Sequence, residues 1–216
     1  MNISRFLFLL LLTVISSKLS GQPDTLFRPS LRIGFDLSGV AKRFLEPDVR
    51  MYEVSADFEW RENWFFALEG GMLGIDMGKP SHSYEAEGWF LRAGADYNFL
   101  HRRDVIHQDL VVAILRYGLG SLNHQAPLII VSDPFWGDYK TSMESGRHLG
   151  HWLEIGAGVK TRIGGNLFIG WSVRTHFLLS QSRDSQITPY MLSGFGRLNR
   201  NPSVMLHYAL YYRIPL

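Results

Sequence analysis

The sequence predicts an all-β fold, an eight-stranded antiparallel transmembrane β-barrel that follows a cleaved signal peptide. Three observations lead to this prediction. The chain begins with a hydrophobic leader, many later segments alternate apolar and polar residues, and the connections between those segments alternate in length. A two-residue period places one set of side chains on each face of a strand. In an exported chain, many such segments are typical of a membrane-spanning barrel.

Residues 1–21 are predicted to be the signal peptide, and residues 22–216 to form the barrel domain. Arg5 supplies the positive charge, and the apolar core runs from Phe6 to Ile15. Small residues before Gln22 provide a cleavage site. The core is too short for a spanning helix, so a retained anchor helix is the less favoured alternative. The chain contains no cysteine, which excludes a lipoprotein anchor, disulfides and thiolate metal sites.

The charge balance gives no case for nucleic-acid binding. The chain has 22 Lys and Arg against 20 Asp and Glu. Two of the basic residues, Arg5 and Lys18, lie in the predicted leader, so the mature chain is neutral. No later segment is apolar over the length that a transmembrane helix requires.

Eight strands are predicted, at 29–40, 51–61, 64–76, 88–99, 109–121, 151–163, 167–179 and 203–215. The pattern is clear in the first strand, where Leu31 and Ile33 flank Arg32. It is least clear in the fifth, because Val111 to Leu115 are apolar on both faces.

The connections support the same topology. Arg61-Glu62-Asn63 and Gly164-Gly165-Asn166 are short enough for tight hairpins. The links 77–87, 122–150 and 180–202 are longer. Bacterial outer-membrane barrels have short periplasmic turns and long extracellular loops, so both chain ends are predicted to lie on the periplasmic side. Within the longest loop, Asp133–Gly137 is expected to be a rigid aromatic turn packed on its own loop, with a ligand platform as the alternative.

Aromatic residues are predicted to form two belts at the membrane interfaces. The periplasmic belt contains Trp60, Trp64, Phe66, Tyr97, Phe99 and Tyr212, and the outer belt contains Tyr52, Trp89, Tyr117 and Phe177. A soluble β-sandwich or lipocalin-like barrel also alternates and is the alternative fold. The leader and the loop asymmetry favour the membrane barrel.

The inward-facing residues are rich in both charges. The predicted lumen charge network consists of Arg32, Asp36, Glu53, Asp57, Glu59, Glu69, Arg92, Asp96, Arg116, Glu154, Lys160, Arg162, Arg174, His176 and Arg213. An eight-stranded barrel is just wide enough for its own side chains to fill. Charges in that space are expected to pair, because an unpaired buried ion costs several kcal/mol. Bulky inward side chains such as Phe90 and Trp152 also argue against a wide pore.

Glu154 and His176 are predicted to be cross-strand partners, because the turn at 164–166 sets the register of the two flanking strands. Arg174 lies diagonal to Glu154 and within its reach. A Glu–His pair can orient a general base, but no nucleophile lies beside it, so a structural cluster is favoured. No catalytic residue and no cofactor are predicted. No metal site is predicted either, because the spacing of His148 and His151 lacks the helical context of a zinc motif.

Several short stretches carry a family resemblance. They are Arg28–Gly34, Tyr97–Leu100, Leu115–Gly118, His151–Ile155, Pro189–Tyr190 with Gly194–Gly196, and Tyr211–Pro215. They resemble a domain-of-unknown-function family of uncharacterised outer-membrane β-barrel proteins from the Bacteroidota. This resemblance implies a small outer-membrane barrel with no assigned activity. The last strand, with Leu210, Tyr212, Ile214 and Leu216 alternating, also looks like the C-terminal signal that the barrel-assembly machinery reads.

The sequence therefore favours a non-enzymatic outer-membrane protein with a largely filled lumen, long extracellular loops, and a role in envelope integrity or surface recognition. Its expected partners are outer-membrane lipid and the barrel-assembly machinery, the chain is expected to be a monomer, and the surface ligand stays open. One alternative is an enzyme that hydrolyses or transfers acyl groups of lipid A or phospholipid. Ser121, His124 and His151 lie at a suitable depth for it. A narrow, porin-like pore is the second alternative.

Overall fold

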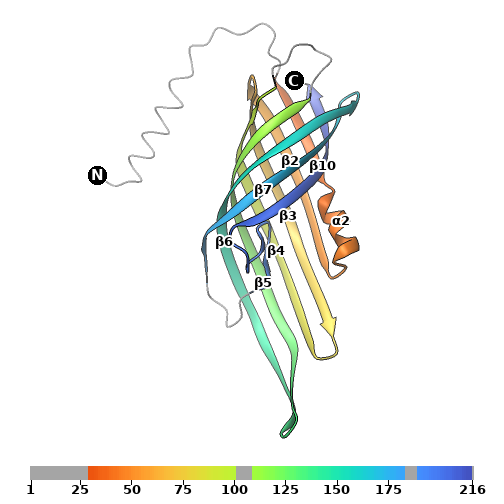
Figure 1. Cartoon of the computed structure of the whole chain (residues 1–216), viewed down its shortest axis with the longest axis vertical. Coiled ribbons are helices and arrows are strands. Elements are labelled where there is room, and N and C mark those ends of the chain that lie inside the picture. The colour runs from red at the N-terminus through yellow and green to blue at the C-terminus, as the bar shows by residue number, and fades with distance from the viewer. Residues whose placement is uncertain (1–28, 101–108, 183–188, 216) are drawn as a thin grey trace, which may run out of the picture.

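A computed structural model describes residues 29–100, 109–182 and 189–215. The predicted leader and Leu216 of the assembly signal lie outside the described residues. Within them, eight strands close into one barrel (Figure 1), which confirms the predicted fold class. The order around the ring is β1-β10-β7-β6-β5-β4-β3-β2, and every neighbouring pair is antiparallel.

The barrel strands are β1 (Ser30–Asp36), β2 (Val49–Arg61), β3 (Trp64–Lys79), β4 (His82–Asn98), β5 (Leu110–Asp133), β6 (Gly137–Gly164), β7 (Leu167–Gln181) and β10 (Ser203–Pro215). The other elements are one helix, α2 (Ser38–Leu45), and the short strands β8 (Met191–Leu192) and β9 (Gly196–Arg197). None of the helical segments in the described ranges has the length and hydropathy needed to cross a membrane.

The two faces of the barrel have the polarity of a membrane protein. Ile155 and Trp171 are about half exposed on the outer face, whereas Glu154 and Arg174 are buried inside. All ten residues predicted to form the aromatic belts are exposed. A soluble barrel would place the apolar set inside. This arrangement is that of a transmembrane β-barrel of the bacterial outer membrane.

The predicted register between β6 and β7 is confirmed, because Glu154 pairs with His176. The turn itself differs in detail from the prediction. Gly164 pairs with Leu167, so the loop has two residues, and a bulge at Ile163 supplies the extra residue. Gly165 has a φ of 51°, which suits glycine in such a turn.

The first strand is shorter than the predicted range 29–40. It ends at Asp36, and α2 follows. The Asp36 carboxylate accepts hydrogen bonds from the backbone N–H of Ser38, at 2.6 Å, and from its hydroxyl. Such local bonds compete with a strand ladder. Gly39 then packs against the backbone carbonyl of Met51, where an added Cβ would collide.

The links predicted to be long outer loops at 77–87 and 122–150 are mostly strand. β3 and β4 continue to Lys79 and His82, and β5 and β6 continue to Asp133 and Gly137. The β5–β6 hairpin extends well past the other strands (Figure 1). Beyond the membrane the outer face no longer has to be apolar, and this weakens the alternation on which the prediction depended.

Within the link predicted at 180–202, the described residues 189–202 turn into the outer end of the barrel. Met191, Leu192 and Phe195 are fully buried and pack in one apolar cluster with Leu122 and Trp152. The ring centroids of Trp152 and Phe195 are 5.9 Å apart. This cluster, the apolar cap, covers the charged part of the lumen.

Candidate functional site

Glu69 of β3 lies at the centre of the charged lumen. Its carboxylate is 2.7 Å from Arg174, 3.1 Å from Arg92 and 3.3 Å from Arg116. These arginines come from β7, β4 and β5, so one buried carboxylate links strands on opposite sides of the barrel. Removing one partner from such a buried set costs more than the pairing itself contributes, because the remaining charges stay buried.

A second group of contacts surrounds Glu154. Its carboxylate accepts a hydrogen bond from the indole N–H of Trp152 at 2.7 Å. Arg92 lies 3.3 Å away, Arg174 3.4 Å and His176 3.5 Å. The His176 side chain also contacts the backbone carbonyl of Phe195 at 3.0 Å. The predicted Glu–His pair therefore lies directly beneath the apolar cap.

A third group connects the lumen charges toward the periplasmic end. Asp96 is 2.7 Å from Arg116 and 3.3 Å from Lys160, and Lys160 also contacts Asp57. Arg92 in addition contacts Glu53. These ion pairs form one continuous set that runs from β2 to β7.

Five further predicted lumen residues have other recorded contacts. Arg32 stacks on the ring of Phe65 at 4.8 Å, and Glu59 accepts a hydrogen bond from Ser30. Arg213 lies near the ring of Phe168, and Arg162 donates to the carbonyl of Gly165 at the β6–β7 turn. Asp36 lies on the seam between β10 and β2, beside His207.

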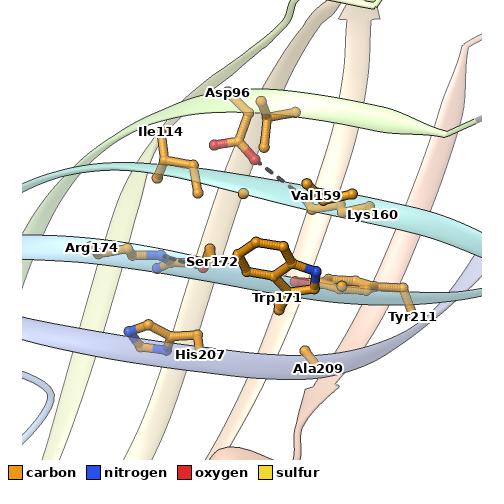
Figure 2. Close-up of a pocket in the computed structure, with 13 residues that line it drawn as sticks. Asp96, Ile114, Val159, Lys160, Trp171, Ser172, Arg174, His207, Ala209 and Tyr211 are labelled. Atoms are coloured by element: carbon orange, nitrogen blue, oxygen red, sulfur yellow. Dashed lines mark hydrogen bonds and ion pairs between the residues drawn. The ribbon is translucent and has the colours of Figure 1, made fainter.

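The lumen leaves little room for a ligand. A cavity of about 10 Å³ lies beside Asp96, Lys160, Arg174 and Tyr211, and Figure 2 shows the residues that line it. That volume holds roughly one water molecule. Binding pockets for small organic molecules measure about 300–1,000 Å³.

The three residues considered for acyl chemistry do not share one face of the barrel. The Ser121 hydroxyl accepts a hydrogen bond from Arg147 at 3.3 Å. His124 is buried beside the ring of Tyr84, whereas His151 lies outside and contacts the Tyr117 hydroxyl at 3.1 Å. Above the apolar band, burial lowers the pKa of His124, and the neighbouring His148 lowers it further.

The tip of the β5–β6 hairpin exposes large apolar side chains. Phe135 is 93% exposed and Trp136 is 91% exposed, and Tyr139 and Val131 are also exposed. The turn at Asp133–Gly137 therefore presents its aromatic residues to the outside, where the expectation was that they pack on their own loop. Exposed aromatic side chains are enriched at protein interfaces.

Among the described residues, the outer part of β6 is paired as a strand along one edge. It pairs with β5 from Gly137 onward, but its pairing with β7 begins only at Gly150. Lys140, Glu144 and Arg147 lie along the segment between them. Charged residues on an exposed edge oppose unspecific strand pairing. This edge is therefore protected against pairing with another strand, whereas the tip presents apolar side chains.

Comparison with solved structures finds other bacterial barrels. The attachment invasion locus protein Ail of Yersinia pestis is 12% identical, with a TM-score of 0.42, over 87% of this chain and 98% of that chain. The N-terminal β-barrel domain of Pseudomonas aeruginosa OprF is 13% identical, with a TM-score of 0.35, over 87% and 98%. Neisserial surface protein A is 10% identical, with a TM-score of 0.35, over 87% and 96%.

Comparison with protein families gives a match over the full length. Residues 1–216 match the family described as domain of unknown function DUF6048. No curated protein matches the chain. The chain belongs to the DUF6048 family.

Proposed function

We propose that this DUF6048 protein is a non-enzymatic outer-membrane protein with a closed lumen, whose β5–β6 hairpin binds a partner at the cell surface. The observation that carries the proposal is a contrast within one pair of strands. One part of each strand encloses a lumen that is filled with paired charges, and the other part extends past the barrel to a tip with exposed aromatic residues (Figure 1).

The filled lumen supports a role without transport or catalysis. The apolar cap covers its outer end, and the ion pairs around Glu69 occupy its middle. The cavity beside Lys160 is far smaller than a substrate pocket. His151 lies on the outer face, whereas Ser121 and His124 are buried, and this separation argues against the enzyme alternative.

The projecting hairpin supports a recognition role. β5 has 24 residues and β6 has 28, whereas a tilted strand crosses the membrane in about 9–11 residues. More than half of each strand is therefore not needed for spanning. An exposed aromatic tip on such an extension is suited to contact another macromolecule.

We extend this proposal to the export, membrane insertion, oligomeric state and source of the chain. A leader at residues 1–21 would direct export, and the barrel-assembly machinery would insert the barrel through the signal in β10. The barrel would act as a monomer within outer-membrane lipid. The stretches quoted above for the family resemblance support a source among the Bacteroidota.

The experiment compares cells of a deletion strain that produce either the wild type or the double variant Phe135→Ser, Trp136→Ser. Attachment is measured on surfaces coated with extracellular-matrix proteins, serum proteins or glycans. We expect the double variant to lose attachment at least tenfold. The control Phe44→Ser removes an equally exposed aromatic residue from α2 and should attach normally.

A second candidate role, in envelope integrity, is favoured by the ion pairs that join β2 to β7. It predicts a different outcome in the same strains. The deletion would make cells sensitive to detergent, and the Phe135→Ser, Trp136→Ser variant would restore full resistance. Attachment would be the same in all strains. That combination would overturn the recognition proposal.

A further inference from the structure

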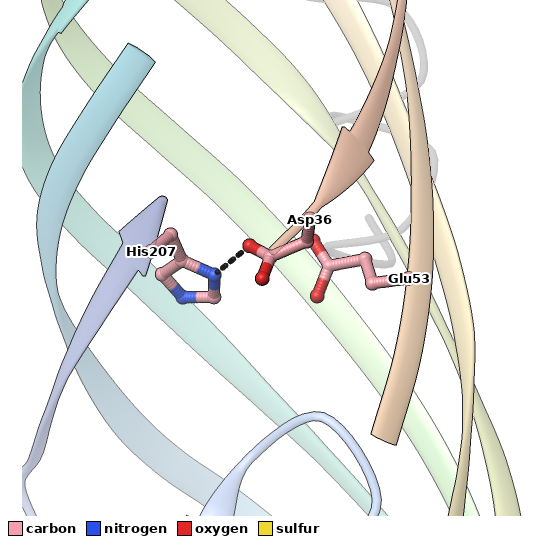
Figure 3. Close-up of side chains that lie close together, drawn as sticks. All are labelled: Asp36, Glu53 and His207. Atoms are coloured by element: carbon pink, nitrogen blue, oxygen red, sulfur yellow. Dashed lines mark ion pairs between the residues drawn. The ribbon is translucent and has the colours of Figure 1, made fainter. Parts of the chain in front are cut away.

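Asp36, Glu53 and His207 converge inside the barrel at the point where β1 ends (Figure 3). The strand register explains why they meet. Asp36 pairs with Ala209 of β10, which places His207 on the adjacent inward position of the same strand. One step beyond the last β1–β2 pair, Asp36 faces Glu53. Three neighbouring strands, β10, β1 and β2, thus each contribute one side chain to one spot.

The spacing of the three donor groups suits a shared ion. One ligand atom from each residue lies within 4.8 Å of the others, and His207 Nδ1 is 3.4 Å from Asp36 Oδ2. Oxygen and nitrogen ligands bind Zn²⁺ at about 2.0–2.2 Å, so two ligands at a tetrahedral angle lie roughly 3.4 Å apart. The side chains need only small adjustments to bind one ion.

Three buried atoms at this spot make no hydrogen bond to any described residue. They are Glu53 Oε2 and both ring nitrogens of His207, and both side chains are only 5% exposed. Arg92 holds the other Glu53 oxygen, and the Glu53 carboxylate points toward Asp36 and His207 (Figure 3). Buried polar atoms almost always have a partner in folded proteins. A bound cation would supply one here.

The two adjacent carboxylates of Asp36 and Glu53 also favour a bound cation. Asp36 and Glu53 are like charges that face each other on adjacent strands, which is destabilising. The recorded contacts of the Asp36 carboxylate are with Ser38 and His207, and neither is an arginine or a lysine. The recorded basic side chain at this pair of carboxylates is that of Arg92, which contacts Glu53.

Ser38 fixes the other oxygen of Asp36 through its backbone N–H and its hydroxyl, and this orients Oδ2 toward His207. Hydrogen bonds that orient a ligand in this way are typical of metal sites.

We propose that Asp36, Glu53 and His207 form a structural site for a divalent transition-metal ion of the Zn²⁺ class. The imidazole ligand favours such an ion over Ca²⁺ or Mg²⁺, which prefer oxygen ligands alone. The ion ties β10 and β1 to β2 where the continuous ion-pair set, from β2 to β7, ends. Because the lumen is closed on this side by the apolar cap, the ion enters while the barrel folds.

The test refolds the full chain from urea into detergent micelles, with either Zn²⁺ or EDTA present. Free metal is then removed and bound zinc is measured by mass spectrometry. We expect about one Zn²⁺ per folded wild-type chain and less than a tenth of that in His207→Gln. The control His148→Gln changes a buried histidine that contacts Gln181 at 3.0 Å, outside the cluster, and should bind zinc as the wild type does.

A second measurement on the wild type keeps the test decisive if His207→Gln fails to fold. Chains refolded with Zn²⁺ should unfold at a higher urea concentration than chains refolded with EDTA, because a ligand that binds the folded state stabilises it. The proposal is overturned if folded wild type retains no zinc, if His207→Gln retains as much, or if an equal concentration of Ca²⁺ prevents zinc binding.

Discussion

The same two strands build two regions with opposite properties. In the barrel body, β5 and β6 have neighbours on both sides, apolar residues such as Leu115 and Ile155 face outward, and charged residues such as Arg116 and Glu154 are paired inside. The projection is the outer part of the β5–β6 hairpin, where β6 lies beyond Gly150, its last residue paired with β7. Large exposed side chains lie at the tip of this projection. The paired charges and the exposed aromatic residues are therefore separated along one hairpin.

This separation has a physical origin. In lipid, every backbone polar group needs a partner within the protein, so the body has to be closed and its charges have to be satisfied internally. Beyond the membrane, water solvates an open edge and charged residues such as Lys140 and Glu144. Substitutions in the body should change the free energy of unfolding, whereas substitutions at the tip should change binding alone.

The largest effect is expected for Glu69→Ala. It leaves three buried arginines without their common carboxylate, and breaking a buried pair in this way costs about 3–5 kcal/mol. Urea titration in detergent, followed by the loss of heat-modifiable migration, measures the change. Glu85→Ala is the control, because Glu85 is an exposed acid bonded to Gln125 on the projection. Equal stabilities of the two variants would contradict the central role of Glu69.

The second-largest loss in the free energy of unfolding is expected for Trp171→Arg. Its side chain is half exposed on the outer face of β7, and an arginine on the lipid-facing side costs about 2–4 kcal/mol near the bilayer midplane. The free energy of unfolding in lipid vesicles gives the value. The same change at the tip, Trp136→Arg, should stay within about 0.5 kcal/mol of wild type. A destabilisation at position 136 as large as that at position 171 would break the comparison between body and projection.

Glu154→Gln should have an intermediate effect. The amide keeps the shape and still accepts the bond from Trp152, but it removes the charge that faces Arg92 and His176. We expect a loss of about 1–3 kcal/mol. The lipid mass spectrum of cells with this variant should equal that of wild type. A change in acylated lipids would indicate that the Glu–His pair acts catalytically.

The smallest effect on the barrel is expected when the projection is removed. Asn123 pairs with Arg147, so an Asn-Gly turn can replace residues 124–146 and close the hairpin there. Heat-modifiable migration should persist, because the ion pairs around Glu69 are untouched. A chain that no longer reaches the folded form would show that the projection stabilises the body.

The body of the barrel was predictable because lipid outside and charge inside impose a strict alternation. The pairing of Glu154 with His176 followed from the same constraint, since a slip by one residue would place charges in lipid. The two-residue turn with its bulge at Ile163 did not follow, because the pattern sets which face a residue occupies and not where an extra residue sits.

Other features depend on contacts that no local pattern contains. The end of β1 is set by the side chain of Asp36 bonding to Ser38, although the residues that follow still resemble a strand. The β8–β9 hairpin becomes buried only through its packing on Trp152 and Leu122. The cluster with His207 required the closure of β1 against β10, which joins opposite ends of the barrel domain.

The conductance of the purified full chain in planar bilayers tests the closed lumen most directly. We expect folded wild-type protein to insert without adding ionic current, because the apolar cap and the ion pairs around Glu69 fill the barrel. Stable, stepwise currents from the folded wild type would contradict it and would place the protein among narrow pores.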